Sequence, residues 1–346
     1  MAETANGQSA KAHTGQTILR RLREAPFAAA AASFSVLAAV YLGSALISGD
    51  PRPLTAYHTP FGLEPVVHTN LVTIALIAYT IAVGLLESRS AVGELGQLRA
   101  ITDCDDETFA VAARASFPSR RAILLALTGG GVLGLGVNGA SWLFFYDLSP
   151  RDLHSHMNNA FMFLMFALLG VLALWGVRSA AFYSSISRRY GRVRLLEPES
   201  LGLFARRGLR LALYWFGGSA LALLLVFQSR GQELVLGLIG LTVAIGLVSL
   251  ILPSLGIHQR VVETKNAELA RVRGEIESRL TALRGGDRGA ATELPALLAW
   301  EARVSAAREW PLGGRVLIRF ALLVLLPLGS WLGGALVERL VDGLLG

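Results

Sequence analysis

Three threonines at helical spacing are the residues of this sequence best placed to meet a ligand or an ion inside a membrane. Thr69, Thr73 and Thr80 follow one another at intervals of four and seven residues within the apolar segment 66–86, so a helix places them on one face. Such hydroxyls can line a pathway. They also bond to carbonyls of their own preceding turn and pack against a neighbouring helix. The spacing leaves both interpretations open, and packing is the simpler one.

The apolar segment 122–146 carries an amide among glycines. Gly130 and Gly134 form a Gly-x-x-x-Gly pair, and Asn138 follows one turn later. Small residues let two helices approach closely, and an asparagine bonds across the contact. The pattern therefore predicts close helix packing, with Asn138 at the helix interface or facing a pathway. A flexible gating helix is the alternative. No Lys-Ser/Thr pair follows the glycines, which excludes a phosphate-binding loop.

Two histidines could bind a metal ion. His154 and His156 lie in a segment expected to be a loop, close to Asp152. Neutral imidazoles suit zinc and copper. Nothing in the sequence brings His58 or His68 to them, so histidines at a membrane surface are the simpler interpretation.

Catalytic constellations are missing from the pattern. There is no His-Glu-x-x-His, no serine nucleophile elbow and no pair of cysteines, and the single Cys104 stands among carboxylates that disfavour a thiolate. We therefore expect a protein that is not an enzyme and has no cofactor. No apolar segment has a charged residue near its centre, which argues against ion-coupled transport.

A cluster of arginines follows the fourth apolar segment. We expect it to attract anionic lipid headgroups rather than nucleic acid. A vestibule that concentrates anions is the alternative. The cluster consists of Arg188, Arg189, Arg192, Arg194, Arg206 and Arg207.

The elements that must position these residues are membrane-spanning helices. Of the 346 residues, 53% are hydrophobic and 16% are charged, whereas soluble domains carry about 25% charged residues. A helix needs about 20 apolar residues to cross a bilayer. The sequence therefore predicts an all-α, multi-pass membrane protein with about seven spans. The expected spans are 27–48, 66–86, 122–146, 159–177, 209–227, 234–257 and 320–337.

Basic residues predict the orientation. If the N-terminus lies in the cytoplasm, 28 of the 32 Lys and Arg residues fall on the cytoplasmic side, the bias that sets topology. We therefore expect a protein of the plasma (inner) membrane with its C-terminus outside, unless 320–337 fails to span. The expected organisation has a disordered basic tail (1–25), a six-span domain (26–257), a cytoplasmic hairpin (258–315) and a last span with its tail (316–346). Loops 87–121 and 178–208 are also expected in the cytoplasm.

The segment 258–315 is the largest polar part of the chain. Leucine, valine and isoleucine recur there at spacings of three and four, which predicts an amphipathic helix that ends near Arg284. A second helix, 293–310, is expected with Thr292 as its cap. The two helices can pack on each other or coil with a second copy. In loop 87–121, Asp103 is the expected cap of another short helix.

These patterns favour two functions over a lipid enzyme. The first is a homo-oligomeric channel whose second span faces the pathway and whose hairpin assists assembly or gating. The second is a membrane-embedded sensor or scaffold whose hairpin recruits a cytoplasmic protein partner.

Overall fold

In the computed structural model the regular elements of the described part are all helices, and Thr102 and Gly191 form one isolated bridge between two connecting segments. It describes residues 24–49, 63–145, 153–195, 202–226, 232–287, 289–310, 318 and 321–322. The chain divides into two compact units. Unit 1 comprises Met1–Gly96, Pro118–Val177 and Tyr214–Gly246, and unit 2 comprises Gln97–Phe117, Arg178–Leu213 and Leu247–Gly346.

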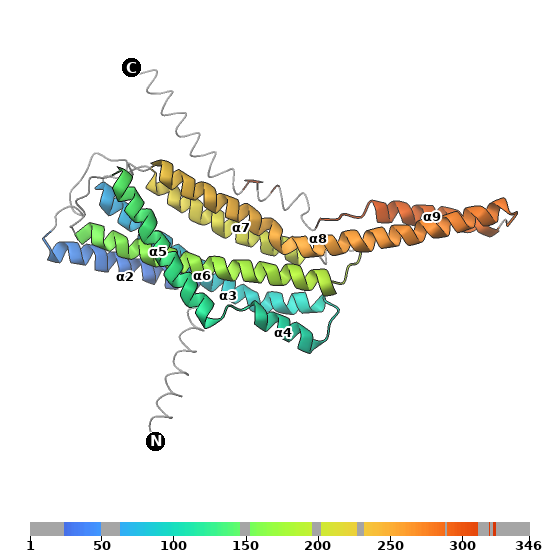
Figure 1. Ribbon diagram of the computed structural model, residues 1–346, viewed down its shortest axis with the longest axis horizontal. Helices are drawn as coiled ribbons and strands as arrows, with labels where there is room; N and C mark the ends of the chain where they lie inside the picture. The colour runs from blue at the N-terminus through green and yellow to red at the C-terminus, as the bar shows by residue number, and fades with distance from the viewer. Residues whose placement is uncertain are drawn as a thin grey trace, which may run out of the picture. The chain divides into compact units, whose positions relative to one another are not determined.

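Within the part of the chain that the structure describes, six helical segments are long and apolar enough to cross a membrane, which is the composition of a multi-pass membrane protein. They belong to α2, α3, α5, α6, α7 and α8 (Figure 1). The helices are α2 (Pro26–Ile47), α3 (Pro65–Ala100), α4 (Asp106–Ser116), α5 (Arg120–Phe145), α6 (Leu153–Tyr190), α7 (Gly202–Ala222, continued by the 3₁₀ turn Leu223–Leu225), α8 (Gln232–Arg284) and α9 (Gly289–Ser305).

The first six expected spans each fall on one of these helices, but several helices are longer than the apolar run. Helix α3 continues to Ala100 and α6 to Tyr190, so much of the expected loops 87–121 and 178–208 is helical. Ser, Glu, Arg, Leu and Ala in these extensions all tolerate a helix, so the helix need not end where hydropathy falls. The expected seventh span, 320–337, lies outside the described residues except for 321–322.

The short helix α4 was expected, but its predicted cap is wrong. Asp105, not Asp103, occupies the N-cap position, and its carboxylate accepts hydrogen bonds from the Thr108 backbone N–H and from the Thr108 hydroxyl. These bonds hold the pKa of Asp105 below its usual value. Asp103 instead forms an ion pair with Arg192, at 2.9 Å. The two aspartates are close in sequence, and only the actual start of the helix separates their roles.

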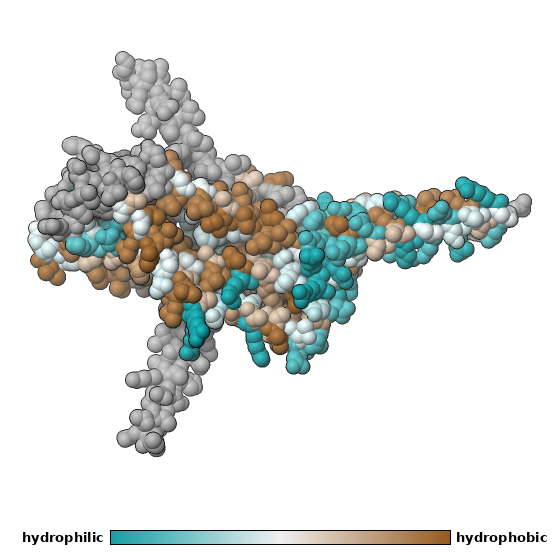
Figure 2. Space-filling model, in the orientation of Figure 1, coloured by the Kyte–Doolittle hydropathy of each residue, from teal (hydrophilic) through white to brown (hydrophobic). Residues whose placement is uncertain are grey.

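The core of unit 1 is built from α2, α3 and α6. Tyr41 of α2, Ile74 and Ile77 of α3, and Phe161 of α6 are buried in one cluster, and the Tyr41 and Phe161 rings meet edge to face with centroids 6.1 Å apart. Unit 1 also exposes hydrophobic side chains, such as Val36 of α2 and Leu125 and Val132 of α5. Figure 2 shows brown, hydrophobic side chains over much of its visible surface. An apolar core and an apolar exterior together suit a unit surrounded by lipid.

In unit 2, backbone and ring contacts join α4, α6 and α7. The Asp103 N–H donates to the Tyr190 carbonyl at 2.6 Å, beside the isolated bridge. Phe109 of α4 packs edge to face on Phe182 of α6, and Tyr183 of α6 packs in the same way on Phe204 of α7. These contacts tie the ends of three helices to one another.

Helices α8 and α9 lie antiparallel and side by side in unit 2 (Figure 1). Their shared seam buries Val272 and Ile276 of α8 and Val304 of α9. The hairpin therefore packs on itself, which is one of the two arrangements that its sequence allows. In Figure 2 its surface is largely teal, that is, hydrophilic.

Polar pairs flank this seam. Arg273 bonds to Glu301 at 2.7 Å, Arg279 to Glu293 at 2.9 Å and Lys265 to Glu309 at 3.0 Å, and each pair joins α8 to residues on or just after α9. The Trp300 indole N–H donates to Glu268 at 2.9 Å. These pairs fix the register of the two helices along the seam.

The turn of the hairpin corrects the predicted start of its second helix. Helix α8 ends at Arg284, as expected, and Gly286 adopts a positive φ of 96° that favours glycine. Helix α9 then begins at Gly289, whose N–H donates to the Asp287 carboxylate, so Thr292 lies inside the helix rather than capping it. The alanines that follow Gly289 are strong helix formers and extend the helix toward its N-terminus.

Candidate functional site

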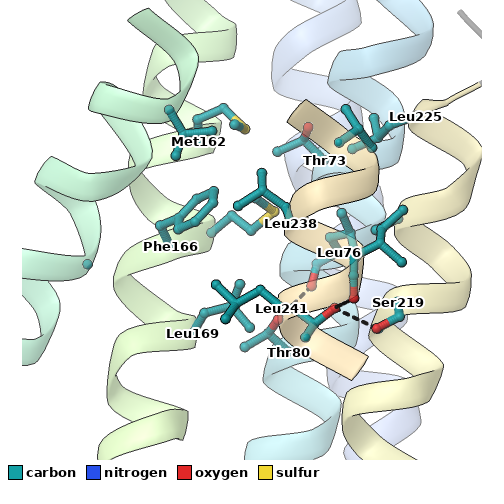
Figure 3. A pocket seen from close by; sticks show the side chains of 18 of the residues that line it. Thr73, Leu76, Thr80, Met162, Phe166, Leu169, Ser219, Leu225, Leu238 and Leu241 are labelled. Carbon is teal, nitrogen blue, oxygen red and sulfur yellow. Dashed lines mark hydrogen bonds between the residues drawn. The ribbon is translucent and has the colours of Figure 1, made fainter. Parts of the chain in front are cut away.

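Unit 1 contains a partly open cavity of about 360 Å³ among α3, α5, α6, α7 and α8. The close-up in Figure 3 shows Leu76 of α3, Phe166 and Leu169 of α6, and Leu238 and Leu241 of α8 around it. Most of its lining is leucine, methionine, valine and aromatic side chains. A space of this size falls in the usual range for small-molecule sites, about 300–1,000 Å³.

The three threonines expected to share a face all line this cavity. Thr69, Thr73 and Thr80 donate their hydroxyl hydrogens to the carbonyls four residues earlier on α3, each at 2.8 Å. Both interpretations of these threonines, lining a pathway and bonding within their own helix, therefore describe part of the structure. The threonines face a space, yet their hydroxyls are hydrogen-bonded within their own helix. The threonines therefore offer a bound molecule only their methyl groups and the lone pairs of their hydroxyl oxygens.

Neutral polar groups lie at a few places on the cavity wall. Asn138 of α5 donates to Asn159 Oδ1 of α6 at 2.7 Å. Ser219 of α7 and Thr242 of α8 share a hydrogen bond with their oxygens 2.6 Å apart, the bond drawn at Ser219 in Figure 3. The Tyr79 hydroxyl donates to the Tyr214 carbonyl at 2.7 Å. These bonds join neighbouring helices around the cavity.

Asn158 is the wall residue that sequence reasoning missed. It lies on α6, is 5% exposed and lines the cavity. Its side-chain oxygen Oδ1 has no hydrogen-bond partner among the described residues. The signal that could have found it is an amide at the edge of an apolar run, whereas Asn138 was selected as an amide among glycines inside one.

The cavity wall is electrically neutral in the described part of the chain. None of the described lining residues is Asp, Glu, Lys, Arg or His. A neutral, mainly apolar wall stabilises uncharged apolar guests and disfavours the entry of a bare charge. The arrangement is therefore suited to binding an apolar molecule by shape, with a few hydrogen bonds to orient it.

Glycines set how closely two of the cavity helices approach. Gly130 and Gly134 lie where α5 crosses α6, and Gly170 of α6 faces α5 at the same crossing. A Cβ added to Gly134 would lie 2.6 Å from the Met162 carbonyl oxygen, and one added to Gly170 would lie 2.5 Å from the Ala126 oxygen. The two backbones therefore leave no room for a side chain at these positions.

The two candidate metal-binding histidines are not brought together. They lie in the first turn of α6 rather than in a loop, and residues two apart on a helix point in different directions. His154 is fully buried and shares a 2.6 Å hydrogen bond with the Tyr41 hydroxyl, whereas His156 is exposed. Among the described residues, no group of three or more His, Cys, Asp or Glu could hold a metal ion.

The arginine cluster divides into an exposed set and one buried residue. Arg207 is 2% exposed, lies over the Tyr183 ring at 4.3 Å and donates to the Ser179 hydroxyl. It therefore belongs to the interior of unit 2 rather than to a surface that meets lipid headgroups. The exposed set consists of Arg188, Arg189, Arg192, Arg194 and Arg206.

Comparison with known proteins adds no relative. No protein-family model, no characterised protein and no solved structure matches this chain.

Proposed function

We propose that this chain is a membrane-embedded sensor in which the cavity of unit 1 takes up a membrane-soluble ligand and the α8–α9 hairpin signals its presence to a cytoplasmic partner. One observation carries the proposal. Helix α8 is a single helix of 53 residues that lines the cavity between Val235 and Ile245 and then forms the first arm of the hairpin. A guest that shifts the cavity wall therefore acts on the element that builds the hairpin.

The proposal includes a topology. The N-terminus, the loops that contain α4 and the arginine cluster, and the hairpin lie in the cytoplasm, because they carry 28 of the 32 basic residues. The segment 320–337 crosses the membrane and places the C-terminus outside. The expected location is the plasma (inner) membrane.

The single cysteine tests this topology in the unaltered protein. Cys104 lies just before α4 and is partly exposed, so it can report on its own side of the membrane. A membrane-impermeant maleimide should label it only after cells are permeabilised. Labelling in intact cells would overturn the proposed orientation.

The coupling is tested by filling the cavity from α8. Leu238 lines the cavity, whereas Leu236, on the same helix, is 45% exposed and is not among the lining residues. With the full chain in lipid nanodiscs, Leu238→Trp should change amide hydrogen exchange in α9, and Leu236→Trp should not. Identical exchange in both variants would show that the cavity and the hairpin are uncoupled.

The partner is tested by removing the hairpin. Deletion of 258–310 should abolish co-purification of the partner while membrane insertion is retained. A partner that still co-purifies with the shortened chain binds elsewhere and contradicts the docking role.

A second candidate is a homo-oligomeric channel, because the four residues expected to face a pathway all line the cavity. These residues are Thr69, Thr73, Thr80 and Asn138. The cavity lies within one chain, so the path that these residues support runs through each subunit of the oligomer rather than between subunits. Purified protein in planar bilayers should then conduct, and Thr73→Leu should reduce the current. An absence of conductance at all pH values, calcium concentrations and voltages tested would count against a channel. A monomeric state in mild detergent would count against a pore between subunits.

A further inference from the structure

We infer that the cavity of unit 1 binds a neutral membrane lipid that carries a hydroxyl group, with the hydrocarbon against the apolar wall and the hydroxyl at Asn158. The inference rests on the proposed role of the cavity as a ligand site, and it names the chemistry of the ligand.

The apolar part of the ligand follows from the size and lining of the cavity. A dry, apolar cavity of about 150 Å³ already holds benzene in another protein. The present cavity is about 360 Å³, and Met162, Phe166 and Leu169 of α6 face Leu238 and Leu241 of α8 across it. The helices around it have the composition of membrane spans, so the surrounding solvent supplies hydrocarbon chains. A lipid tail is thus the guest that is both abundant and of matching polarity.

The head group is inferred to be neutral because the described part of the cavity wall lacks charged residues. No described lining residue is ionisable except Tyr79 and Tyr214, so the wall offers no counter-ion for a carboxylate, a phosphate or an amine. A charged group moved into such a wall loses its hydration without compensation. Fatty acids and phospholipid headgroups are therefore disfavoured inside the cavity.

The hydroxyl follows from Asn158. Asn158 is 5% exposed, and its side-chain Oδ1 accepts no hydrogen bond from the described residues. A buried acceptor without a donor costs free energy, and a guest that donates one hydrogen bond removes that cost. A hydroxyl also accepts, so it satisfies either orientation of the amide, whose oxygen and nitrogen are assigned from the surrounding bonds.

The test uses photoreactive probes on the full chain in phosphatidylcholine nanodiscs. The probes are a long-chain alcohol, the matching fatty acid and the matching alkane, each with a diazirine in its tail. The alcohol should label peptides of α6 that contain Met162 and Met165, and excess dioleoylglycerol should compete whereas excess oleate should not. The alcohol should exceed the other two probes by about tenfold, the discrimination that one buried hydrogen bond gives.

Two variants locate the site. Asn158→Leu should remove the preference for the alcohol over the alkane, while labelling by the alkane remains. Asn70→Leu is the matched control, because Asn70 is also buried with an Oδ1 that lacks a partner among the described residues but does not line the cavity. If either asparagine variant fails to fold, Met162→Trp decides the matter, since it fills the cavity and should suppress labelling by the alcohol.

Several outcomes overturn the inference. Equal labelling by alcohol and fatty acid would remove the hydroxyl preference. Labelling confined to exposed residues such as Leu124 and Val132, unaffected by Met162→Trp, would indicate lipid on the outer surface only. No labelling by any probe would mean that the cavity takes up no lipid. A failed hydrogen-exchange response to Leu238→Trp, with labelling intact, would overturn the sensor and leave the lipid site standing.

Discussion

In unit 1, the threonine hydroxyls of α3 bond to carbonyls of their own helix, whereas in unit 2 the charged side chains of α8 bond to partners on or next to α9. Side-chain bonds between helices of unit 1 include neutral pairs, such as Asn138 with Asn159 and Ser219 with Thr242. Between the arms of the hairpin, the bonds include ion pairs such as Arg273 with Glu301. Both arrangements hold helices together, but they suit different solvents.

The difference shows which interaction determines each packing. In lipid, burying an apolar surface gives little advantage because the lipid tails are apolar too. Close backbone approach and neutral hydrogen bonds therefore determine which helices pack together. In water, exposed ion pairs contribute little, about 0–1 kcal/mol each, so the buried seam must supply most of the stability of the hairpin. We therefore expect unit 1 to be most sensitive at its glycines, and the hairpin at its seam.

The largest effect is expected at the α5–α6 crossing. Gly130→Ala places a methyl group against the Phe166 carbonyl oxygen, closer than side chains approach backbone, and should lower the free energy of unfolding by about 2–3 kcal/mol. Gly136→Ala is the control, because nothing lies within 4 Å of its added Cβ and alanine favours the helix. Unfolding in mixed detergent micelles measures both. Equal stability of the two variants would refute close packing as the determinant of unit 1.

The next effect is expected in the hairpin seam. Val272 is fully buried between the arms, so Val272→Ala should destabilise the hairpin by about 1–2 kcal/mol through the lost apolar contact. Glu277→Ala, at an exposed position on the same helix, should change little. Amide hydrogen exchange of α9 in the full chain reports both. If Glu277→Ala had the larger effect, surface charge rather than the seam would stabilise the hairpin.

A smaller effect is expected at the cap of α4. Asp105→Ala removes both bonds to Thr108, so amides in the first turn of α4 should exchange several-fold faster. Glu107→Ala, in the same turn but not at the cap position, is the control. A stronger response to Glu107→Ala would place the start of the helix elsewhere.

The smallest effect is expected when the hairpin is exposed to low pH. Hydrogen bonds from Arg271 and from the Trp300 indole lower the pKa of Glu268 from 4.5 to about 2. Because the folded pKa lies below the unfolded one, the stabilisation is complete above pH 4.5 and is lost as the pH falls toward 2. Hydrogen exchange at Trp300 should therefore increase modestly over that window, and less so in Glu268→Gln. An increase that is the same in both chains would assign the acid response to other groups.

The sequence predicted the first six spans well because each is a local property. A run of about 20 apolar residues marks a helix in lipid wherever its partners lie. The start of α4 was misplaced because Asp103 and Asp105 are both good caps, and only the backbone bonds around the Thr102–Gly191 bridge decide between them. The start of α9 was missed for a similar reason, since Thr292 is a good cap that the longer helix does not use.

The sequence could predict only part of the cavity wall. The threonine face of α3 follows from spacing, and so does the glycine face of α5. The sequence pattern of one helix does not show which other helices pack against these faces, because that depends on tertiary packing. Ser219, Thr242 and Asn158 come from three other helices. In the sequence, Ser219 and Thr242 are isolated polar residues in apolar runs, and Asn158 is one of several polar residues at the start of α6.

The length of α8 exceeds what a membrane span requires. At 1.5 Å per residue its 53 residues correspond to about 80 Å, whereas a bilayer core is only about 30 Å thick. Pro253 lies inside this helix and cannot donate a backbone hydrogen bond, so it is the position at which α8 bends most easily. Under the proposed sensor role, α8 is therefore a jointed rod rather than a rigid one, and Pro253 is its joint.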